Sequence, residues 1–333
     1  MDHLYDMHSR RIRYVRISVT DRCNFRCQYC MPPEGVNWLP HEMIMRYEEY
    51  IRIMKILVSH GVDKVRITGG EPLLRRGLTG FIQRLSAIEG IRDLSLTTNG
   101  MLMSTMAKEL RDAGLNRVNI SLDTLDRTKF AQITRVDAYD MVRAGIERAL
   151  ECGLSPVKIN VVAIRGFNDD EIPDFARMTL SDPVEIRFIE LMPMGCIARH
   201  GNQELISSSE VQEIIENIHG PLEPLEYSLG PARVFKIPGA RGKIGLIGAM
   251  SEHTFCHRCN RIRITSSGGL RPCLFSEETV DLLSPMRRGI TDGELDSLII
   301  SGVKMKPLNH GLCRGKEFLC GRESYTLMNS IGG

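Results

Sequence analysis

The chain has 333 residues, of which 42% are hydrophobic and 25% are charged. This length is enough to bury a sizeable core in one large α/β domain and a smaller second domain. Because 43 basic side chains are balanced by 41 acidic ones, the formal net charge is +2, which excludes a protein that coats nucleic acid. The polar start, Met1–Asp6, and the lack of an apolar run of about 18 residues predict neither a secretory signal nor a membrane span. We therefore expect a soluble, cytoplasmic protein that binds no nucleic acid and no membrane.

Short β-type runs alternate with helical patterns between residues 13 and 190. The six runs are Arg13–Thr20, Lys64–Thr68, Asp93–Thr98, Arg117–Asp123, Pro156–Ala163 and Glu185–Leu191. Between the first two, apolar residues recur at positions 47, 51, 54 and 58, a spacing that predicts an amphipathic helix. Six β–α repeats predict a parallel sheet that is either doubly wound or closed as a partial barrel.

The first five of these strands have one apolar face and one polar face. In the first strand the apolar residues are Val15, Ile17 and Val19, and the polar residues between them are Arg16, Ser18 and Thr20. A complete eight-stranded barrel fills its interior with branched aliphatic side chains, and burying many unpaired polar groups is costly. The polar face is therefore predicted to line a wet or ligand-filled cavity in an incomplete, splayed barrel. A sheet face exposed to solvent is the alternative.

Four cations are predicted on this polar face: Arg16, Arg66, Lys158 and Arg187. Cations that converge in a cavity repel each other unless an anion neutralises them. Pairing with carboxylates such as Asp123 or Glu190 would neutralise one or two of them. A multiply charged ligand such as a triphosphate is the interpretation that we favour.

A segment rich in glycine and proline, between residues 220 and 248, is typical of a linker and turns. Beyond its start, short β-type runs near 233–237, 244–248 and 261–265 precede a helix near 292–301. We therefore predict two domains: a barrel over residues 1–220 and a smaller α+β domain over residues 221–333.

Six of the ten cysteines form two triads. The triads are Cys23, Cys27 and Cys30, and Cys256, Cys259 and Cys273. Without a secretory signal, the cysteines are expected to stay reduced. Three thiolates hold three irons of a four-iron cluster and leave the fourth iron open for a ligand. No role is assigned to the remaining cysteines, which are Cys152, Cys196, Cys313 and Cys320.

The first triad has the spacing C-x3-C-x2-C, directly after the first predicted strand. A zinc knuckle is the structural alternative. The motif, placed after the first strand of a β–α series, resembles the radical S-adenosylmethionine (radical SAM) superfamily. There the open iron binds the methionine part of S-adenosylmethionine, and the reduced cluster cleaves it to a 5′-deoxyadenosyl radical. The segment Gly69–Pro72 also resembles a glycine-rich segment of that superfamily. By this resemblance, the residues that contact S-adenosylmethionine would be Tyr29, Gly70, Ser121 and Met192.

The second triad has the spacing C-x2-C-x13-C, which leaves a zinc site and an iron–sulfur cluster both open. His253 or His257 would be the fourth ligand of such a zinc site. Strand alternation, however, places Arg261 and Arg263 on one face beside the triad. Two guanidiniums next to an open cluster favour a site that binds phosphates or a purine.

The two triads, the Arg-x-Arg pair and the terminal Gly332-Gly333 together closely resemble the GTP 3′,8-cyclase family, from Tyr14 to the end of the chain. Members catalyse the first step of molybdenum cofactor biosynthesis. The resemblance implies an α/β fold with an incomplete (β/α)6 barrel of the TIM type, followed by a smaller α+β cluster-binding domain. It also implies two [4Fe-4S] clusters, a homodimer, an external electron donor, and cyclic pyranopterin monophosphate synthase as the downstream enzyme.

The same resemblance implies where GTP binds and how it reacts. Guanine would bind the open iron of the second cluster, and the GTP contacts would be Arg16, Arg66, Thr97, Lys158, Arg261 and Arg263, with Lys64 and Arg187 as further candidates. The catalytic candidates are Arg16, Gly332 and Gly333. The radical would take a hydrogen from ribose C3′, and the carbon radical would attack guanine C8. The product would be (8S)-3′,8-cyclo-7,8-dihydroguanosine 5′-triphosphate.

Two other functions compete with this one. A radical enzyme that modifies a peptide often carries extra C-terminal clusters, but it usually has more cysteines there and lacks Arg-x-Arg. A non-catalytic electron carrier or a zinc-bound interaction protein would leave the polar lumen unexplained.

Overall fold

The computed structural model describes residues 3–194, 204–225, 230–252 and 254–311, together with two short strands, β13 (Cys313–Arg314) and β14 (Glu317–Phe318). Several residues named from the sequence lie outside the described residues: His253, Cys196, Cys320, Gly332 and Gly333. Among the helices of the described part, none has the length and apolar character needed to cross a bilayer.

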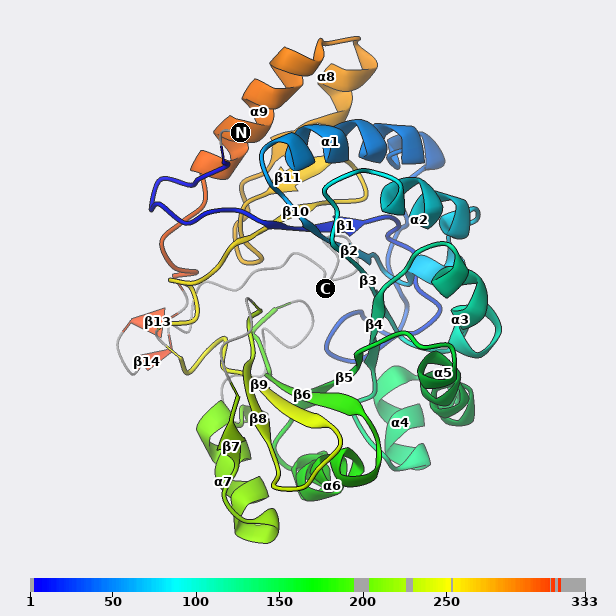
Figure 1. Ribbon diagram of the computed structural model, residues 1–333, viewed down its shortest axis with the longest axis vertical. Helices are drawn as coiled ribbons and strands as arrows, with labels where there is room; N and C mark the ends of the chain where they lie inside the picture. The colour runs from blue at the N-terminus through cyan, green and yellow to red at the C-terminus, as the bar shows by residue number, and fades with distance from the viewer. Residues whose placement is uncertain are drawn as a thin grey trace.

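Six parallel strands form the centre of the fold, in sequence order across the sheet. They are β1 (Tyr14–Ser18), β2 (Lys64–Thr68), β3 (Asp93–Thr98), β4 (Arg117–Ser121), β5 (Val157–Ala163) and β6 (Val184–Glu190). Parallel neighbours need crossover connections, and helices supply them. The sheet curves into an open arc with these helices along its outer side (Figure 1). The predicted incomplete barrel is confirmed.

The helices follow the strands as the β–α pattern predicts. They are η1 (His41–Met43), α1 (Tyr47–Ser59), η2 (Pro72–Leu74), α2 (Leu78–Ser86), α3 (Met103–Asp112), α4 (Arg127–Thr134), α5 (Tyr139–Glu151), η3 (Asp169–Glu171), α6 (Ile172–Ser181), α7 (Ser208–His219), α8 (Leu283–Arg287) and α9 (Asp292–Lys304). The predicted stripe of α1 is partly right: Ile51 and Met54 are buried, but Tyr50 and Leu57 are buried in place of Tyr47 and Val58. Those two side chains are only partly buried against the core.

The C-terminal strands extend the same sheet at both edges. They are β7 (Glu223–Pro224), β8 (Arg233–Lys236), β9 (Lys243–Ile247), β10 (Arg261–Ile264), β11 (Gly269–Arg271) and β12 (Val280–Asp281). Strand β9 pairs in parallel with β6, and β10 pairs in parallel with β1, so one twelve-stranded sheet runs from β12 to β7. The division after residue 220 therefore stays a prediction, and the sheet continues across it.

The apolar strand faces pack beneath the helices. Val15 and Ile17 of β1 are fully buried, as are Ile262 and Ile264 of β10, which lie directly beside them. The polar residues that alternate with them face the inside of the arc. The predicted two-faced strands are thus confirmed, and packing on the outer face fixes where each polar side chain lies.

Ile262→Ala tests whether β10 belongs to the barrel core. Removing this fully buried side chain should lower the free energy of unfolding by about 2–5 kcal/mol, since it leaves a cavity between β10 and β1. Chemical denaturation measures the change, and Ile218→Ala, at a side chain that is 59% exposed, is the matched control. If residues 221–333 unfold independently, Ile262→Ala will shift only a separate transition and leave that of the barrel unchanged.

Candidate cofactor and substrate site

One cavity lies at the carboxyl ends of the barrel strands, where such barrels place their chemistry. Both cysteine triads line it, as do eight other residues predicted from the sequence: Arg16, Tyr29, Gly70, Thr97, Ser121, Met192, Arg261 and Arg263. Four predicted GTP contacts do not line this cavity: Lys64, Arg66, Lys158 and Arg187. The structure thus brings together two triads that are more than 200 residues apart in the sequence.

The loop that carries the first triad is fastened on two sides. On one side, Gly70 N–H donates to the Thr20 carbonyl over 2.8 Å, which ties the start of the loop to the end of β2. On the other side, Arg135 donates to the carbonyls of Arg26 and Met31, over 2.7 and 3.0 Å. These bonds fix the loop around the three cysteines before any ligand binds.

Gly70 must be glycine because the loop backbone passes directly over it. A Cβ atom at this position would lie 2.3 Å from the Arg22 carbonyl oxygen and 2.7 Å from that of Asp21. Only a residue without a side chain allows this approach. The motif that suggested a cofactor contact therefore also has a structural role, which is to seat the cysteine loop on the end of β2.

Glu71 belongs to the same motif, although the motif predicts no role for it. It is fully buried and accepts hydrogen bonds from Asn99 N–H over 2.7 Å and from Thr98 Oγ1 over 2.8 Å. Burial raises the pKa of this carboxyl to about 7, although the hydrogen bonds oppose the rise. Glu71 thus joins the ends of β2 and β3 below the first triad.

Tyr29, within the first triad, is oriented by Asp123 at the end of β4. Its hydroxyl donates to Asp123 Oδ2 over 2.7 Å, and Asp123 Oδ1 accepts from Val162 N–H over 2.9 Å. Burial raises the pKa of Asp123 to about 6, against these bonds. Asn168 then donates to the Asp123 carbonyl over 2.6 Å and to the Val162 carbonyl over 2.9 Å.

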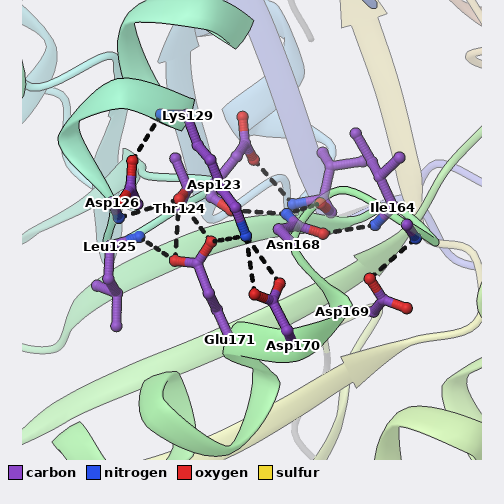
Figure 2. Close-up of polar contacts among 12 residues, drawn as sticks. Asp123, Thr124, Leu125, Asp126, Lys129, Ile164, Asn168, Asp169, Asp170 and Glu171 are labelled. Carbon is purple, nitrogen blue, oxygen red and sulfur yellow. Dashed lines mark hydrogen bonds and ion pairs between the residues drawn. The ribbon is translucent and has the colours of Figure 1, made fainter.

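Glu171 accepts hydrogen bonds from the residues that directly follow Asp123 (Figure 2). It accepts from Thr124 Oγ1 over 2.7 Å and from Leu125 N–H over 2.5 Å, while Lys129 donates to it over 3.0 Å. These contacts join the β4–α4 connection to the turn that precedes α6. This network could not be predicted from the sequence, because its partners lie about 45 residues apart and follow no motif.

The second triad lies beside cations. Burial would raise the pKa of the Cys259 thiol, but Arg261 and then Lys306 outweigh burial and lower it to about 6. Arg261 also stacks over Phe255, with its guanidinium carbon 5.3 Å from the ring centre. Arg261 therefore lies beside the second triad, and its contact with GTP stays a prediction.

Three arginines stand side by side on neighbouring strands. Arg16 of β1 lies in register with Arg263 of β10 on one side and with Arg66 of β2 on the other. Like charges on directly opposed residues destabilise a sheet. Burial lowers the pKa of Arg66 and of Arg263, and Arg16 lowers both further. An anion bound above this row would relieve the repulsion, which supports the predicted anionic ligand.

Tyr14, which no motif of the sequence indicates as a site residue, lies beside this row. Its hydroxyl accepts a hydrogen bond from Arg16 Nε over 3.3 Å, and the Arg66 guanidinium carbon is 5.4 Å from its ring centre. Burial would raise the pKa of this phenol, but Arg66 and then Arg16 outweigh burial and lower it to about 7. A tyrosine with this pKa changes charge near neutral pH.

Two of the lumen cations pair with a carboxylate, as the alternative to an anionic ligand allows, although the carboxylate is not one of the two named as examples. Glu185 of β6, not Asp123 or Glu190, pairs with Lys158 and with Arg187, each over 2.6 Å. Burial would raise the pKa of Glu185, but Arg187 and then Lys158 outweigh burial and lower it to about 2. Glu190 instead accepts backbone N–H groups of the segments that follow β6 and β9. Two of the four predicted cations therefore share one carboxylate, which balances one of their two positive charges.

Three buried polar atoms on the lumen side have no hydrogen-bond partner among the described residues: Thr97 Oγ1, Asn119 Nδ2 and Asn160 Oδ1. Buried polar atoms are nearly always paired. Thr97 and Asn160 line the cavity, so a ligand or ordered water there would supply the missing partner. This fits the prediction that Thr97 contacts the substrate.

Comparison with known proteins identifies the family. Residues 17–179 match the Radical SAM superfamily, and residues 184–312 match the family described as Molybdenum Cofactor Synthesis C. A protein of Pelotomaculum thermopropionicum named GTP 3′,8-cyclase is 47% identical, over 94% of this chain and 96% of its own. One of Thermodesulfovibrio yellowstonii with the same name is 51% identical, over 91% and 94%.

The chain belongs to the GTP 3′,8-cyclase family. Among solved structures, Streptococcus suis SuiB bound to S-adenosylmethionine matches with a TM-score of 0.61 and 15% identity, over 90% of this chain and 69% of that one. That likeness shows the fold alone. Its agreement with the arc of parallel strands supports the radical SAM barrel.

S-adenosylmethionine and iron–sulfur clusters are the cofactors of this family, and the first triad fits such a cluster. Burial raises the pKa of Cys23 to about 11, and burial together with Cys30 and Asp123 raises that of Cys27 well above its usual value. Buried thiols of this kind give up their protons when a metal cation binds. They therefore need a cation to act as thiolates at neutral pH.

The thiols of each triad lie close to one another. In the first triad, Cys30 and Cys23 raise the pKa of Cys27, and in the second, Cys273 and Cys259 raise that of Cys256. In a four-iron cluster each cysteine binds a different iron, so three thiols that lie near one another fit such a cluster at each triad.

Gly70→Ala tests whether the close contact between Gly70 and the cysteine loop positions the first triad. The new methyl group would collide with the Arg22 and Asp21 carbonyls, so the loop must shift and should lose bound iron and S-adenosylmethionine. Iron analysis after anaerobic reconstitution measures the loss. Gly80→Ala, in α2 with nothing within 4 Å of the added Cβ, is the matched control. Full iron content and normal cleavage of S-adenosylmethionine in Gly70→Ala would show that the contact is not needed.

Proposed function

We propose that this chain cyclises GTP to (8S)-3′,8-cyclo-7,8-dihydroguanosine 5′-triphosphate, the first step of molybdenum cofactor biosynthesis. Relatives named GTP 3′,8-cyclase, which match this chain over nearly its full length, support the proposal. One observation carries it: both cysteine triads and the arginines between them line the same cavity. The reaction needs a radical source and a nucleotide site within reach of each other, and this cavity offers both.

The first triad and its surroundings form the proposed radical source. Cys23, Cys27 and Cys30 would hold the first cluster, and its S-adenosylmethionine would be contacted by Tyr29, Gly70, Ser121 and Met192, all of which line the cavity. When bound there, S-adenosylmethionine and an electron from an external donor supply the 5′-deoxyadenosyl radical. The residues of the chain bind and orient this cofactor, and they keep water away from the radical.

The second triad and the arginine row form the proposed GTP site. Cys256, Cys259 and Cys273 would hold the second cluster, whose open iron would take the guanine. Of the predicted contacts, Arg16, Thr97, Arg261 and Arg263 line the cavity and can meet the triphosphate directly. Arg66 adds its charge from the next strand. Lys158 and Arg187 are held by Glu185, so they would reach phosphate only by exchanging that partner.

Other parts of the proposal concern partners and location. We infer a homodimer, a cytoplasmic location, no binding to nucleic acid or membrane, and cyclic pyranopterin monophosphate synthase as the enzyme that takes up the product. Gly332 and Gly333, with Arg16, remain the proposed catalytic residues.

The function is tested by anaerobic reconstitution followed by incubation with GTP and S-adenosylmethionine. We expect 5′-deoxyadenosine and a cyclised nucleotide of the same mass as GTP, which mass spectrometry after chromatographic separation detects. Cys23→Ser should abolish 5′-deoxyadenosine formation, because it removes one ligand of the first cluster. Normal cleavage in Cys23→Ser would refute the assignment of the first triad, and cleavage without a nucleotide product would refute GTP as the substrate.

Arg263→Ala separates substrate binding from cluster binding. Loss of a charged hydrogen bond to phosphate costs about 1.5–3 kcal/mol, so the KM for GTP should rise roughly 10- to 100-fold with iron content unchanged. Arg261→Ala should lose iron as well, since the Arg261 side chain hydrogen-bonds the Cys259 thiol. The control is Arg76→Ala, at an exposed arginine. Equal iron loss in both variants would make Arg263 a structural residue.

Tyr14 predicts how GTP affinity depends on pH. Above its pKa of about 7 the phenol is an anion that competes with the triphosphate for Arg16 and Arg66. Affinity should therefore fall between about pH 6 and about pH 8 in the wild type, relative to Tyr14→Phe, which has no ionisable hydroxyl. Calorimetric titration with GTP at each pH measures the affinity of both proteins. Their ratio is independent of the ionisation of GTP itself, because that ionisation affects both proteins equally. A ratio that does not change with pH would contradict this role.

A further inference from the structure

Lys306 is a buried lysine beside the second triad, and no motif of the sequence points to it. It follows α9, is only 3% exposed, and lines the cavity. Its ammonium group donates to the Arg261 carbonyl and to the Pro272 carbonyl, each over 2.8 Å. Those carbonyls belong to the two segments that carry Cys259 and Cys273.

A buried ammonium group is costly unless it is hydrogen-bonded and its charge is compensated. The two carbonyls use two of its three N–H donors, but they bring no full negative charge. Within the described part of the chain, no carboxylate forms an ion pair with Lys306. The thiolates of the triad are anions that the site can offer, and Lys306 acts electrostatically on both Cys256 and Cys259.

The position of Lys306 also bears on the substrate side of the site. Its bond to the Arg261 carbonyl fixes the start of β10, the strand that carries the Arg261 and Arg263 guanidiniums. Its bond to the Pro272 carbonyl fixes the residue next to Cys273, at the other end of the triad. One side chain therefore joins the arginine strand to the segment of the last cysteine.

We propose that Lys306 is a positioning residue of the second cluster, which joins the two segments that carry Cys259 and Cys273 and supplies a fixed positive charge beside the three thiolates. This inference rests on the proposed function, because it requires that the second triad holds a cluster. Net charge and hydrogen bonding around a cluster set its reduction potential. A buried cation there favours the reduced, more negative state.

The test uses the full chain with the first triad removed by Cys23→Ser, Cys27→Ser and Cys30→Ser, so that only the second triad can bind a cluster. In this parent, Lys306→Met removes both the charge and the donors, whereas Lys306→Gln removes the charge and keeps amide donors. Lys304→Met is the matched control, because it makes the same change of charge at an exposed position two residues away. Iron per chain and the midpoint potential, from a redox titration followed by electron paramagnetic resonance, are measured for each.

We expect both Lys306 variants to disfavour cluster reduction about tenfold, a shift of about 59 mV to lower potential for one electron. Lys304→Met should match the parent, since solvent screens its charge. Lys306→Met should also lose iron, and Lys306→Gln should retain more of it. If Lys306→Met does not fold, Lys306→Gln alone decides the role of the charge.

Two results would overturn the proposal. A midpoint potential in Lys306→Gln equal to that of Lys304→Met would refute the role of the charge, and parental iron content in Lys306→Met would refute the joining of the segments. Failure of the proposed function looks different: the parent itself, with its second triad intact, would bind no iron. That result would remove the second cluster and, with it, the role of Lys306.

Discussion

Repulsion among neighbouring cations is the constraint on which the rest of this structure depends. Arg263, Arg16 and Arg66 occupy matching positions on three adjacent parallel strands, where backbone pairing allows none of them to move away. Between buried charges this repulsion is screened far less than in water. The apolar outer face, where Ile17 and its neighbours are fully buried, holds the strands together against it. The proposed polyanionic ligand would offset this cost and make the same row a binding surface.

The sheet topology explains why the two triads share a cavity. Because β10 pairs with β1 and β9 pairs with β6, the C-terminal segments approach the lumen from both edges of the open barrel. Strand β10 brings Arg261 and Arg263 alongside β1 and carries the second triad with it. An incomplete barrel leaves room for this arrangement, whereas a closed one would have no free edge to accept β10.

Local patterns predicted much of this structure, and long-range pairing accounts for what they missed. Alternation along β1 to β5 revealed which face is polar, and tight spacing revealed both triads, since each feature lies within a few residues of sequence. Alternation cannot name partners across the sheet, so the sequence left open which carboxylate pairs with Lys158, and the structure identifies it as Glu185. Tyr14 and Lys306 were missed for the same reason, because their roles come from neighbours on β2 and β10.

The surroundings of the two triads differ in the sign of their charge. Glu71 and Asp123 lie near the first triad and raise the pKa of Cys23 and Cys27 in addition to burial. Arg261 and Lys306 lie near the second triad and lower the pKa of Cys259 against burial. S-adenosylmethionine is a sulfonium cation and GTP is a polyanion, so each proposed ligand would meet the opposite charge in its own half of the cavity. Exchanging the two ligands would place each beside charges of its own sign, so this charge difference favours the proposed placement of the two ligands.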